Sequence, residues 1–335
     1  MKKTKKAFTA NASIVNSFWK WFKGVYFTYE LSRAVVPLIL LIIVSIALAP
    51  GYFLKPINIK VILMQLTPLT LIATGEMLII LMGSIDLSPG SALAATAMLS
   101  ALVIRRYGSL ELAILVAIAL GTMIGAINGL LVSKFKIYSF VATLAALVIW
   151  RSFVIVISGG KLIYGLTAYN VFVQDFGTYI PLGFVITLMI VIAIYFMLTR
   201  TVLGRYIYGI GSNEDAVRLA GIRADLAKFL AFTLAGTLYG IGGVMLIAMS
   251  GLAVDPWTAR GFELNAIASC VLGGVMLTGG SGHPLSGLLG AAILTILSNI
   301  LVLLGITEIA VQQTVVGIVL IAAATALTRG LKYAK

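Results

Sequence analysis

Ten long apolar runs dominate this chain and constrain its fold more than any other feature. They lie at about 34–50, 59–82, 87–104, 110–133, 140–158, 181–199, 228–250, 263–278, 284–303 and 308–327. A helix that crosses a bilayer needs roughly 20 apolar residues. Only 10% of the 335 residues are charged, which is too few to cover a soluble globule of this size. We therefore predict an all-α polytopic membrane protein with about ten transmembrane helices.

Two of the runs are interrupted by polar residues or glycine. The third run follows Asp86, Ser88 and Pro89, and the eighth ends in a glycine cluster at Gly279. Non-helical backbone is tolerated at membrane depth where protein or a water-filled path covers it. We expect broken or re-entrant helices at these two places.

Positive charge predicts the orientation. With alternating spans, 17 Lys and Arg residues fall on the side of the N-terminus and six on the other side. Cytoplasmic loops carry the excess of Lys and Arg. The sequence thus predicts a multi-pass protein of the plasma (cytoplasmic) membrane with both termini in the cytoplasm.

The chain divides into a basic N-terminal segment, 1–33, and a transmembrane domain, 34–330, that contains a cytoplasmic loop, 200–228. Within the first segment, apolar residues from Ile14 to Tyr29 follow a helical period beside Lys20 and Lys23. This pattern predicts a helix on the inner membrane face. Residues 1–12 fit a disordered basic tail equally well.

Small residues recur at a spacing of four in two of the runs. They are Gly121, Gly125 and Gly129 in the fourth run, and Gly236 and Gly240 in the seventh. This spacing lets helix backbones approach closely. We interpret these glycines as helix-packing residues.

The two halves of the chain contain a weak internal repeat. The segment 83–91 (GSIDLSPGS) corresponds to 279–287 (GGSGHPLSG), and Asn128 corresponds to Asn299. Internal repeats with interrupted helices are frequent in transporters. The repeat favours a transporter.

Ionisable side chains at membrane depth are costly and require a partner or a function. We expect Glu76 to form a structural pair with Arg151, and the alternative partner for Arg151 is a helix end. A relay through Glu76, Asp86 and His283 would instead indicate an ion-coupled secondary transporter. His283 is better interpreted as a cap or loop residue.

The sequence predicts no enzyme, metal site or cofactor. It contains one His and one Cys, which is too few for a His/Cys metal cluster. It also contains no nucleotide-binding lysine motif and no hydrolase motif. If ATP drives transport, the ATPase is a separate chain.

The cytoplasmic loop contains the signals of a short helix. Ser212 or Asn213 can cap its start, Glu214 and Asp215 occupy its first turn, and Gly221 can end it. A capped helix held away from the membrane fits a groove on a partner protein. An ordinary interfacial loop is the alternative.

Three sequence blocks resemble the ribose-type sugar permeases of ATP-binding-cassette (ABC) importers. The blocks are GSIDLSPGS at 83–91, GRYIYGIGSNEDA at 204–216 followed by Gly221-Ile222, and GFELNAIA at 261–268 followed by LGG and GG. They occur in family-like order over about residues 59–330. Ser84, Pro89 and Asn265 depart from the family pattern and leave the substrate open.

The resemblance implies a permease subunit that translocates a sugar or sugar-like solute. Its partners would be separate ATPase subunits, an extracytoplasmic solute-binding protein and a second permease subunit, in a homodimer or heterodimer. Helix 211–222 would be the coupling helix that contacts the ATPase. Its expected coupling residues are Gly211, Asn213, Glu214, Ala216, Arg218 and Gly221.

We expect polar residues next to the helix breaks to line the substrate path. These candidates are Asp86, Ser88, Asn128, Glu263, Asn265 and Asn299. A passage for a sugar needs hydrogen-bonding groups without strong binding. The alternative for the asparagines is an interhelical hydrogen bond, and for Asp86 it is a helix cap.

Other functions remain open at this point. The main alternative is an ion-coupled secondary transporter. The others are ABC permeases for nucleosides or for branched-chain amino acids, and the Ile-Asp-Leu-Ser block argues against the amino-acid permease.

Overall fold

The computed structural model describes residues 30–177 and 179–333, and the regular elements in these ranges are all helical. The elements are α2 (Ser32–Leu48), α3 (Pro56–Leu81), α4 (Pro89–Tyr107), α5 (Leu110–Ser133), α6 (Ser139–Ser158), η1 (Thr167–Val173), α7 (Leu182–Arg200), α8 (Val202–Leu219), α9 (Ala224–Met249), α10 (Phe262–Leu272), α11 (Ser286–Leu303) and α12 (Ile309–Tyr333). The predicted all-α class is confirmed. The helix expected between Ile14 and Tyr29 lies outside the described residues.

Six helices are long and apolar enough to cross a membrane by length and composition, namely α3, α5, α6, α7, α9 and α11. The helices α2 and α10 are shorter apolar segments, and α12 contains another at 310–322. The helix α4 has 19 residues, but it carries Arg105 and Arg106 in its last turn. The structure therefore identifies a multi-pass bundle.

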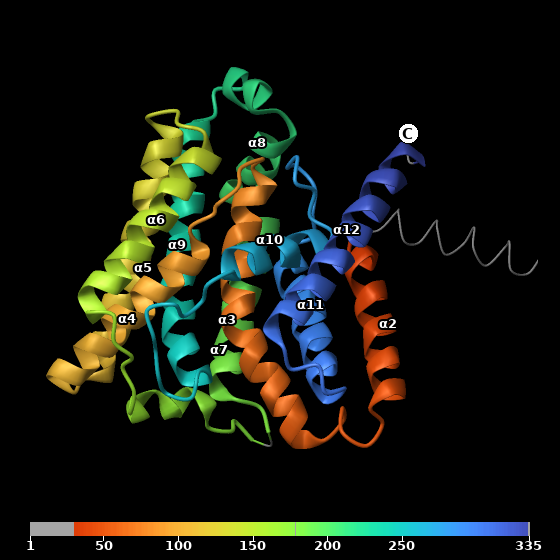
Figure 1. Ribbon diagram of the computed structural model, residues 1–335. Coiled ribbons are helices and arrows are strands. Elements are labelled where there is room, and N and C mark those ends of the chain that lie inside the picture. Colours follow the sequence, from red (N-terminus) through yellow and green to blue (C-terminus); the bar gives the residue numbers. More distant parts are fainter. Residues whose placement is uncertain (1–29, 178, 334–335) are drawn as a thin grey trace, which may run out of the picture.

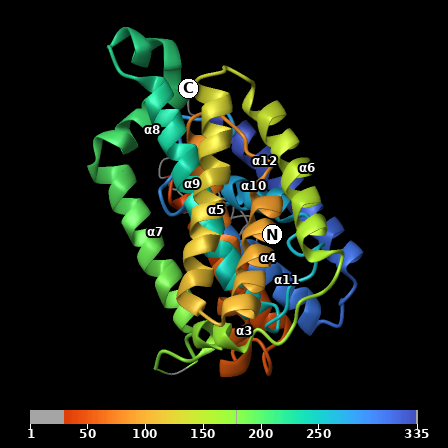
Figure 2. The same ribbon diagram turned by 90° about the vertical axis from the view of Figure 1, so that its left-hand side faces the viewer.

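The long helices α3 and α9 form the centre of the bundle (Figure 1). The side chains of both are largely buried, which explains why they are apolar around most of their circumference. The helices α4, α5 and α6 pack on one side of this centre, whereas α2, α11 and α12 lie on the other (Figures 1 and 2).

Glycines bring α5 and α9 into close contact, as the spacing of four predicts. A methyl group on Gly125 would lie 2.2 Å from the carbonyl oxygen of Phe232, and one on Gly236 would lie 2.3 Å from that of Gly121. Neither backbone can retreat without separating the two helices. These glycines are helix-packing residues, as interpreted from the sequence.

Both interrupted runs are irregular in the structure. After α3 ends at Leu81, an extended segment runs back into the bundle, and α4 begins near its middle (Figure 1). The helix α10 has 11 residues and also lies at about half height (Figure 1). Eleven residues rise about 16 Å, which is about half of the hydrocarbon core. Both positions agree with the expected helix breaks.

We predict that Gly236→Ala destabilises the bundle, because its methyl group would overlap the backbone of α5. Overpacking of this kind costs about 1–3 kcal/mol. The matched control is Gly317→Ala, since Gly317 is also helical and has no heavy atom within 4 Å of an added methyl group. Thermal unfolding in detergent should show a lower midpoint for Gly236→Ala alone. Equal midpoints for both variants would contradict the close contact.

Candidate functional site

The first helix break is held by side chains that bind its backbone. Between α3 and α4, four consecutive N–H groups have no helical partner and bind side-chain oxygens instead. The N–H groups of Ile85, Asp86, Leu87 and Ser88 donate to Ser139 Oγ (3.2 Å), Glu76 Oε1 (3.1 Å), Thr143 Oγ1 (3.0 Å) and Asp86 Oδ1 (2.7 Å), respectively. Helices α3 and α6 thus supply three of the four acceptors that fix this extended segment, and Asp86 of the segment itself supplies the fourth.

Three of the predicted path residues form one buried network at this break. Ser88 Oγ donates to Asp86 Oδ1 (2.6 Å), and Asn128 Nδ2 donates to Ser88 Oγ (2.9 Å). Tyr239 of α9 donates its hydroxyl to Asp86 Oδ2 (3.3 Å). The side chains of Asp86, Ser88 and Asn128 are at most 1% exposed. In this conformation they lie within the subunit and line no open passage.

Glu76 belongs to the same network, and the expected pair with Arg151 is wrong. Glu76 is fully buried and binds the backbone of Asp86 through one carboxylate oxygen. Arg151 instead donates to the carbonyl oxygens of Pro256 (3.3 Å) and Thr258 (2.7 Å), in the connection between α9 and α10. The sequence could not indicate these partners of Arg151, because every residue type carries a backbone carbonyl.

The second break places Glu263 and Asn265 on α10. Glu263 Oε1 accepts from the N–H of Gly261 (3.2 Å), and its other oxygen lies against Gly90 at the start of α4, with no hydrogen-bond partner. Asn265 is half-buried two residues further along α10, which is about half a turn. The two breaks therefore meet where α10 approaches the start of α4.

Asn299 lies apart from the other path candidates. It exchanges two hydrogen bonds with Asn58 of α3, with Asn58 Nδ2 to Asn299 Oδ1 at 3.1 Å and Asn299 Nδ2 to Asn58 Oδ1 at 2.8 Å. Asn299 is 6% exposed, so this pair joins α3 to α11 within the subunit. Asn299 and Asn128 correspond in the sequence, but they bind different partners in the structure.

The short helix predicted within residues 200–228 begins and ends where the sequence predicts. Asn213 is non-helical (φ −164°, ψ 99°), and its Oδ1 accepts from the N–H of Ala216 (3.0 Å), which caps the second part of α8. Gly221 has φ +79°, and the next N–H, of Ile222, binds the carbonyl of Val217 (3.3 Å). This is the glycine-dependent helix end expected from the sequence.

The polar face of this helix binds α9 through a chain of ion pairs. Glu214 pairs with Lys228 (2.5 Å) and Arg218 (2.7 Å), Arg218 also pairs with Asp225, and Asp225 pairs with Lys136 (2.5 Å). Partial burial raises the pKa of the Glu214 carboxyl, but hydrogen bonds from Lys228 and Arg218 outweigh it and leave the pKa below its ordinary value. Glu214 and Arg218 thus orient the helix within the subunit.

The opposite face of the short helix is uncovered. Leu219 is 90% exposed, and Ala216 and Ala220 are also exposed. The short helix stands out from the end of the bundle (Figure 1). Because ion pairs hold the polar face of this helix against α9, its apolar face remains available for contact with another protein.

Gly211 lies at a junction of three chain segments rather than on this exposed face. A methyl group on Gly211 would lie 1.9 Å from the carbonyl oxygen of Leu81 and 2.4 Å from the N–H nitrogen of Gly280. Gly280 donates that N–H to Leu81 (2.9 Å). The segments that follow α3 and α10 therefore meet at α8, where Gly83, Gly211 and Gly279 lie against one another, so that the three sequence blocks converge in space.

Comparisons with known proteins identify close relatives. The family described as branched-chain amino acid transport system / permease component matches residues 58–324. The ribose import permease protein RbsC of Escherichia coli K12 is 36% identical over 281 residues, which cover 82% of this chain and 87% of the relative. The D-allose transport system permease protein AlsC of the same strain is 35% identical, over 87% and 90% of the two chains.

A third relative is named for a different solute. The autoinducer 2 import system permease protein LsrC of Enterobacter sp. 638 is 36% identical over 78% of this chain and 76% of the relative. No solved structure matches this chain. The resemblance to ribose-type permeases that the three sequence blocks indicated is confirmed by these relatives.

Proposed function

This chain belongs to the family of transport-system permease components that matches residues 58–324, and from that premise we propose that it is the membrane subunit of an ABC importer. The observation that carries the proposal is the short helix 214–219, which is capped at both ends and presents an uncovered apolar face. This helix couples the permease to a separate ATPase subunit. Leu219, Ala216 and Ala220 fill an apolar groove on that subunit, because a buried apolar anchor surrounded by polar groups is the usual design of a contact site.

The proposed solute is a sugar or sugar-like molecule delivered by an extracytoplasmic binding protein. Two of the relatives are named for ribose and D-allose, which are both polyhydroxylated, and the third is named for autoinducer 2. The family description mentions branched-chain amino acids, but these three relatives are not named for them. An ion-coupled carrier is not favoured, because Glu76 and Asp86 bind the backbone of a helix break and form no relay with His283.

The proposed architecture has about ten helices in the membrane and both termini in the cytoplasm. The six long apolar helices form its core, and the remaining helices in the membrane are α2, α4, α10 and α12, of which α10 covers only about half of the thickness. The helix 214–219 and the segment between α5 and α6, with Lys134 and Lys136, lie at the same end of the bundle (Figure 1). This end carries the Lys/Arg excess and faces the cytoplasm.

A second permease subunit completes the proposed path. Along α10 and α12, polar side chains face outward at membrane depth, including the half-buried Asn265 and the exposed Gln313. Polar groups facing lipid are costly, so this face borders protein and water rather than hydrocarbon. The solute passes between the two subunits along Glu263 and Asn265. Asp86, Ser88 and Asn128 form the wall behind them, and Asn299 joins α3 to α11.

We predict that substitution of one path candidate lowers stability, whereas substitution of another lowers uptake alone. In Asp86→Asn, an NH2 group replaces the oxygen that accepts from Tyr239, so that buried donors are left without an acceptor. Each such donor costs about 1–3 kcal/mol of stability, so the thermal midpoint of the purified permease should fall. Asn265→Ala should leave that midpoint unchanged and reduce uptake of radiolabelled ribose or the native solute by the assembled complex at least several-fold. Normal uptake by an assembled Asn265→Ala complex would exclude Asn265 from the path.

Orientation can be measured with one introduced thiol. The natural Cys270 is fully buried, so it should react little with a water-soluble reagent. We predict that Leu219→Cys, in the permease produced without its ATPase subunit, is labelled by a membrane-impermeant maleimide in inside-out vesicles and is protected in intact cells. Labelling in intact cells would reverse the proposed topology.

We predict that Leu219→Glu uncouples the permease from its ATPase. Because Leu219 is 90% exposed, the change should not alter the thermal midpoint of the isolated permease, yet it places a charge in the contact with the ATPase. Co-purification of the ATPase and uptake should both fall about tenfold or more, since one buried anchor contributes roughly 2 kcal/mol. Leu219→Met is the control and should retain both. Unchanged co-purification of the Glu variant would show that the helix is an ordinary loop.

A further inference from the structure

The connection between α9 and α10 presents an exposed tryptophan beside an exposed arginine. Trp257 is 57% exposed, and the guanidinium of Arg260 lies over its ring, 5.8 Å from the ring centroid. Tryptophan is highly buried on average, because its ring has a large apolar area to remove from water. An indole that stays uncovered within a packed bundle therefore points to a binding role.

Hydrogen bonds on both sides of Trp257 fix its position. Its N–H donates to Asp255 Oδ1 (2.6 Å), and Thr258 donates its hydroxyl to Asp255 Oδ2 (3.1 Å). Arg151 of α6 binds the carbonyl oxygens of the two flanking residues, Pro256 and Thr258. The ring is thus presented by a fixed backbone, and a site that is ordered before its ligand arrives loses little entropy on binding.

The backbone is strained two residues further on. Ala259 has φ +60°, a region that residues other than glycine rarely adopt, and its side chain is buried. The contacts around Trp257 and the burial of Ala259 maintain this conformation. Backbone strain of this kind is concentrated at functional sites.

Trp257 lies at membrane depth rather than beyond the end of the bundle. The connection runs from the end of the bundle opposite helix 214–219 to α10 at about half height (Figure 1). A methyl group on Gly90, in the first turn of α4, would lie 2.7 Å from the carbonyl oxygen of Ala259. Arg151 lies about 10 Å along α6 from the end of that helix. A small solute inside the membrane reaches this depth more readily than a folded partner docked outside it.

The surface around Trp257 is polar. Next to Arg260, Gly261 approaches α12, where the side-chain nitrogen of Gln313 would lie 4.0 Å from an added methyl group. Arg260 and Gln313 are both exposed, and a guanidinium facing hydrocarbon at this depth would be costly. This surface therefore borders water or protein, and it continues into the proposed path along Glu263 and Asn265.

We propose that Trp257 stacks against the solute in the outer half of the path, while Arg260 donates hydrogen bonds to the solute's hydroxyl groups. This inference rests on the proposed import of a sugar or sugar-like molecule. A sugar ring carries C–H groups on its faces and hydroxyl groups around its edge. The C–H groups pack on the electron-rich face of the indole, and the guanidinium supplies N–H donors for the hydroxyl oxygens.

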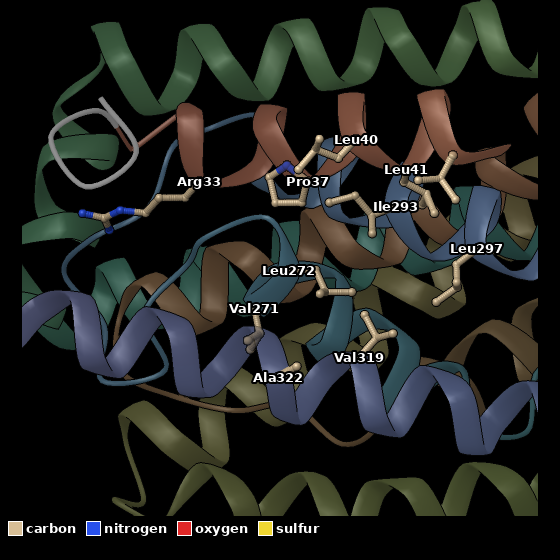
Figure 3. A pocket seen from close by; sticks show the side chains of 11 residues that line it. Arg33, Pro37, Leu40, Leu41, Val271, Leu272, Ile293, Leu297, Val319 and Ala322 are labelled. Atoms are coloured by element: carbon tan, nitrogen blue, oxygen red, sulfur yellow. The ribbon is translucent and has the colours of Figure 1, made fainter. Parts of the chain in front are cut away.

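An apolar groove elsewhere in the bundle lacks this combination. It lies between α2 and α12 and has a volume of about 400 Å³ (Figure 3). Its described lining consists of aliphatic side chains and Arg33. A sugar there would exchange hydrogen bonds with water for contacts with aliphatic groups, which costs free energy. The pairing of an aromatic face with hydrogen-bond donors favours Trp257 as the sugar contact.

The first test measures uptake of D-ribose and D-allose by the complete complex in vesicles, expressed per assembled complex. Trp257→Leu should lower the uptake rate about fivefold, which is the typical effect of losing one aromatic contact. Trp257→Phe should retain most of the uptake, because a phenyl ring keeps a stacking face. The matched control is Tyr107→Leu, which should leave uptake unchanged. Tyr107 is 62% exposed and has Arg106 over its ring (5.7 Å), but it lies at the end of α4.

The second test observes the ring directly in the full-length permease without its partners. Trp257 becomes the only tryptophan after Trp19→Phe, Trp21→Phe and Trp150→Phe. D-Ribose and D-allose should change its fluorescence saturably, because a sugar on the ring displaces water from it. Glycerol at the same concentration has hydroxyl groups but no ring face, and it should produce no saturable change.

Three results would overturn the proposal, and they have different meanings. Unchanged uptake by Trp257→Leu, or a Trp257 that responds to neither sugar, would exclude the site and leave the importer intact. Failure of the wild-type complex to take up either sugar would refute the proposed solute class and this site together. Loss of the second permease subunit from the Trp257→Leu complex would place the ring in the subunit interface instead.

Discussion

The fold depends on satisfying the backbone where α3 stops and α4 begins inside the bundle. At membrane depth no bulk water is available to bind an exposed N–H group, and each unsatisfied group costs several kcal/mol. Four side-chain acceptors, supplied by α3, α6 and the break itself, bind four consecutive N–H groups here. Glu76 and Asp86 are present at this depth because they make an interrupted helix possible.

The break also determines how the rest of the bundle packs. The helix α4 starts near the middle of the molecule, so α9 can lie beside α3, α4 and α5 together. Glycines on α5 and α9 bring these helices into backbone contact, and Tyr239 on α9 reaches Asp86. Helix packing and the polar network are therefore parts of one arrangement. A change in the position of α9 relative to α5 would alter the hydrogen bond on Asp86.

A second junction connects this arrangement to the end of the bundle that carries helix 214–219. The first part of α8 approaches Leu81 and Gly280 so closely that only glycine fits at position 211. Tyr208, one turn earlier, donates its hydroxyl to the carbonyl of Gly282 (2.7 Å). Movement of α8 would thus reach the segments after α3 and after α10 through backbone contacts. This gives a physical route between an exposed apolar helix and the two breaks.

The sequence by itself determined the features that arise from local chemistry. Apolar runs specified the helices, the spacing of glycines marked one close-packing face on α5 and another on α9, and Asn213 and Gly221 specified the limits of the short helix. Each of these depends on residues within a few turns of one another. The resemblance to permeases likewise rests on contiguous blocks of sequence.

Only the tertiary structure decided which distant groups meet. It placed Glu76 on the backbone of Asp86, directed Arg151 to loop carbonyls and paired Asn299 with Asn58. It also moved Gly211 from a presumed surface contact into a junction of three segments. A carboxylate, a guanidinium or an amide can bind many partners, and a backbone carbonyl has no signature in the sequence. The choice among partners therefore follows from how the helices pack rather than from the residues taken one at a time.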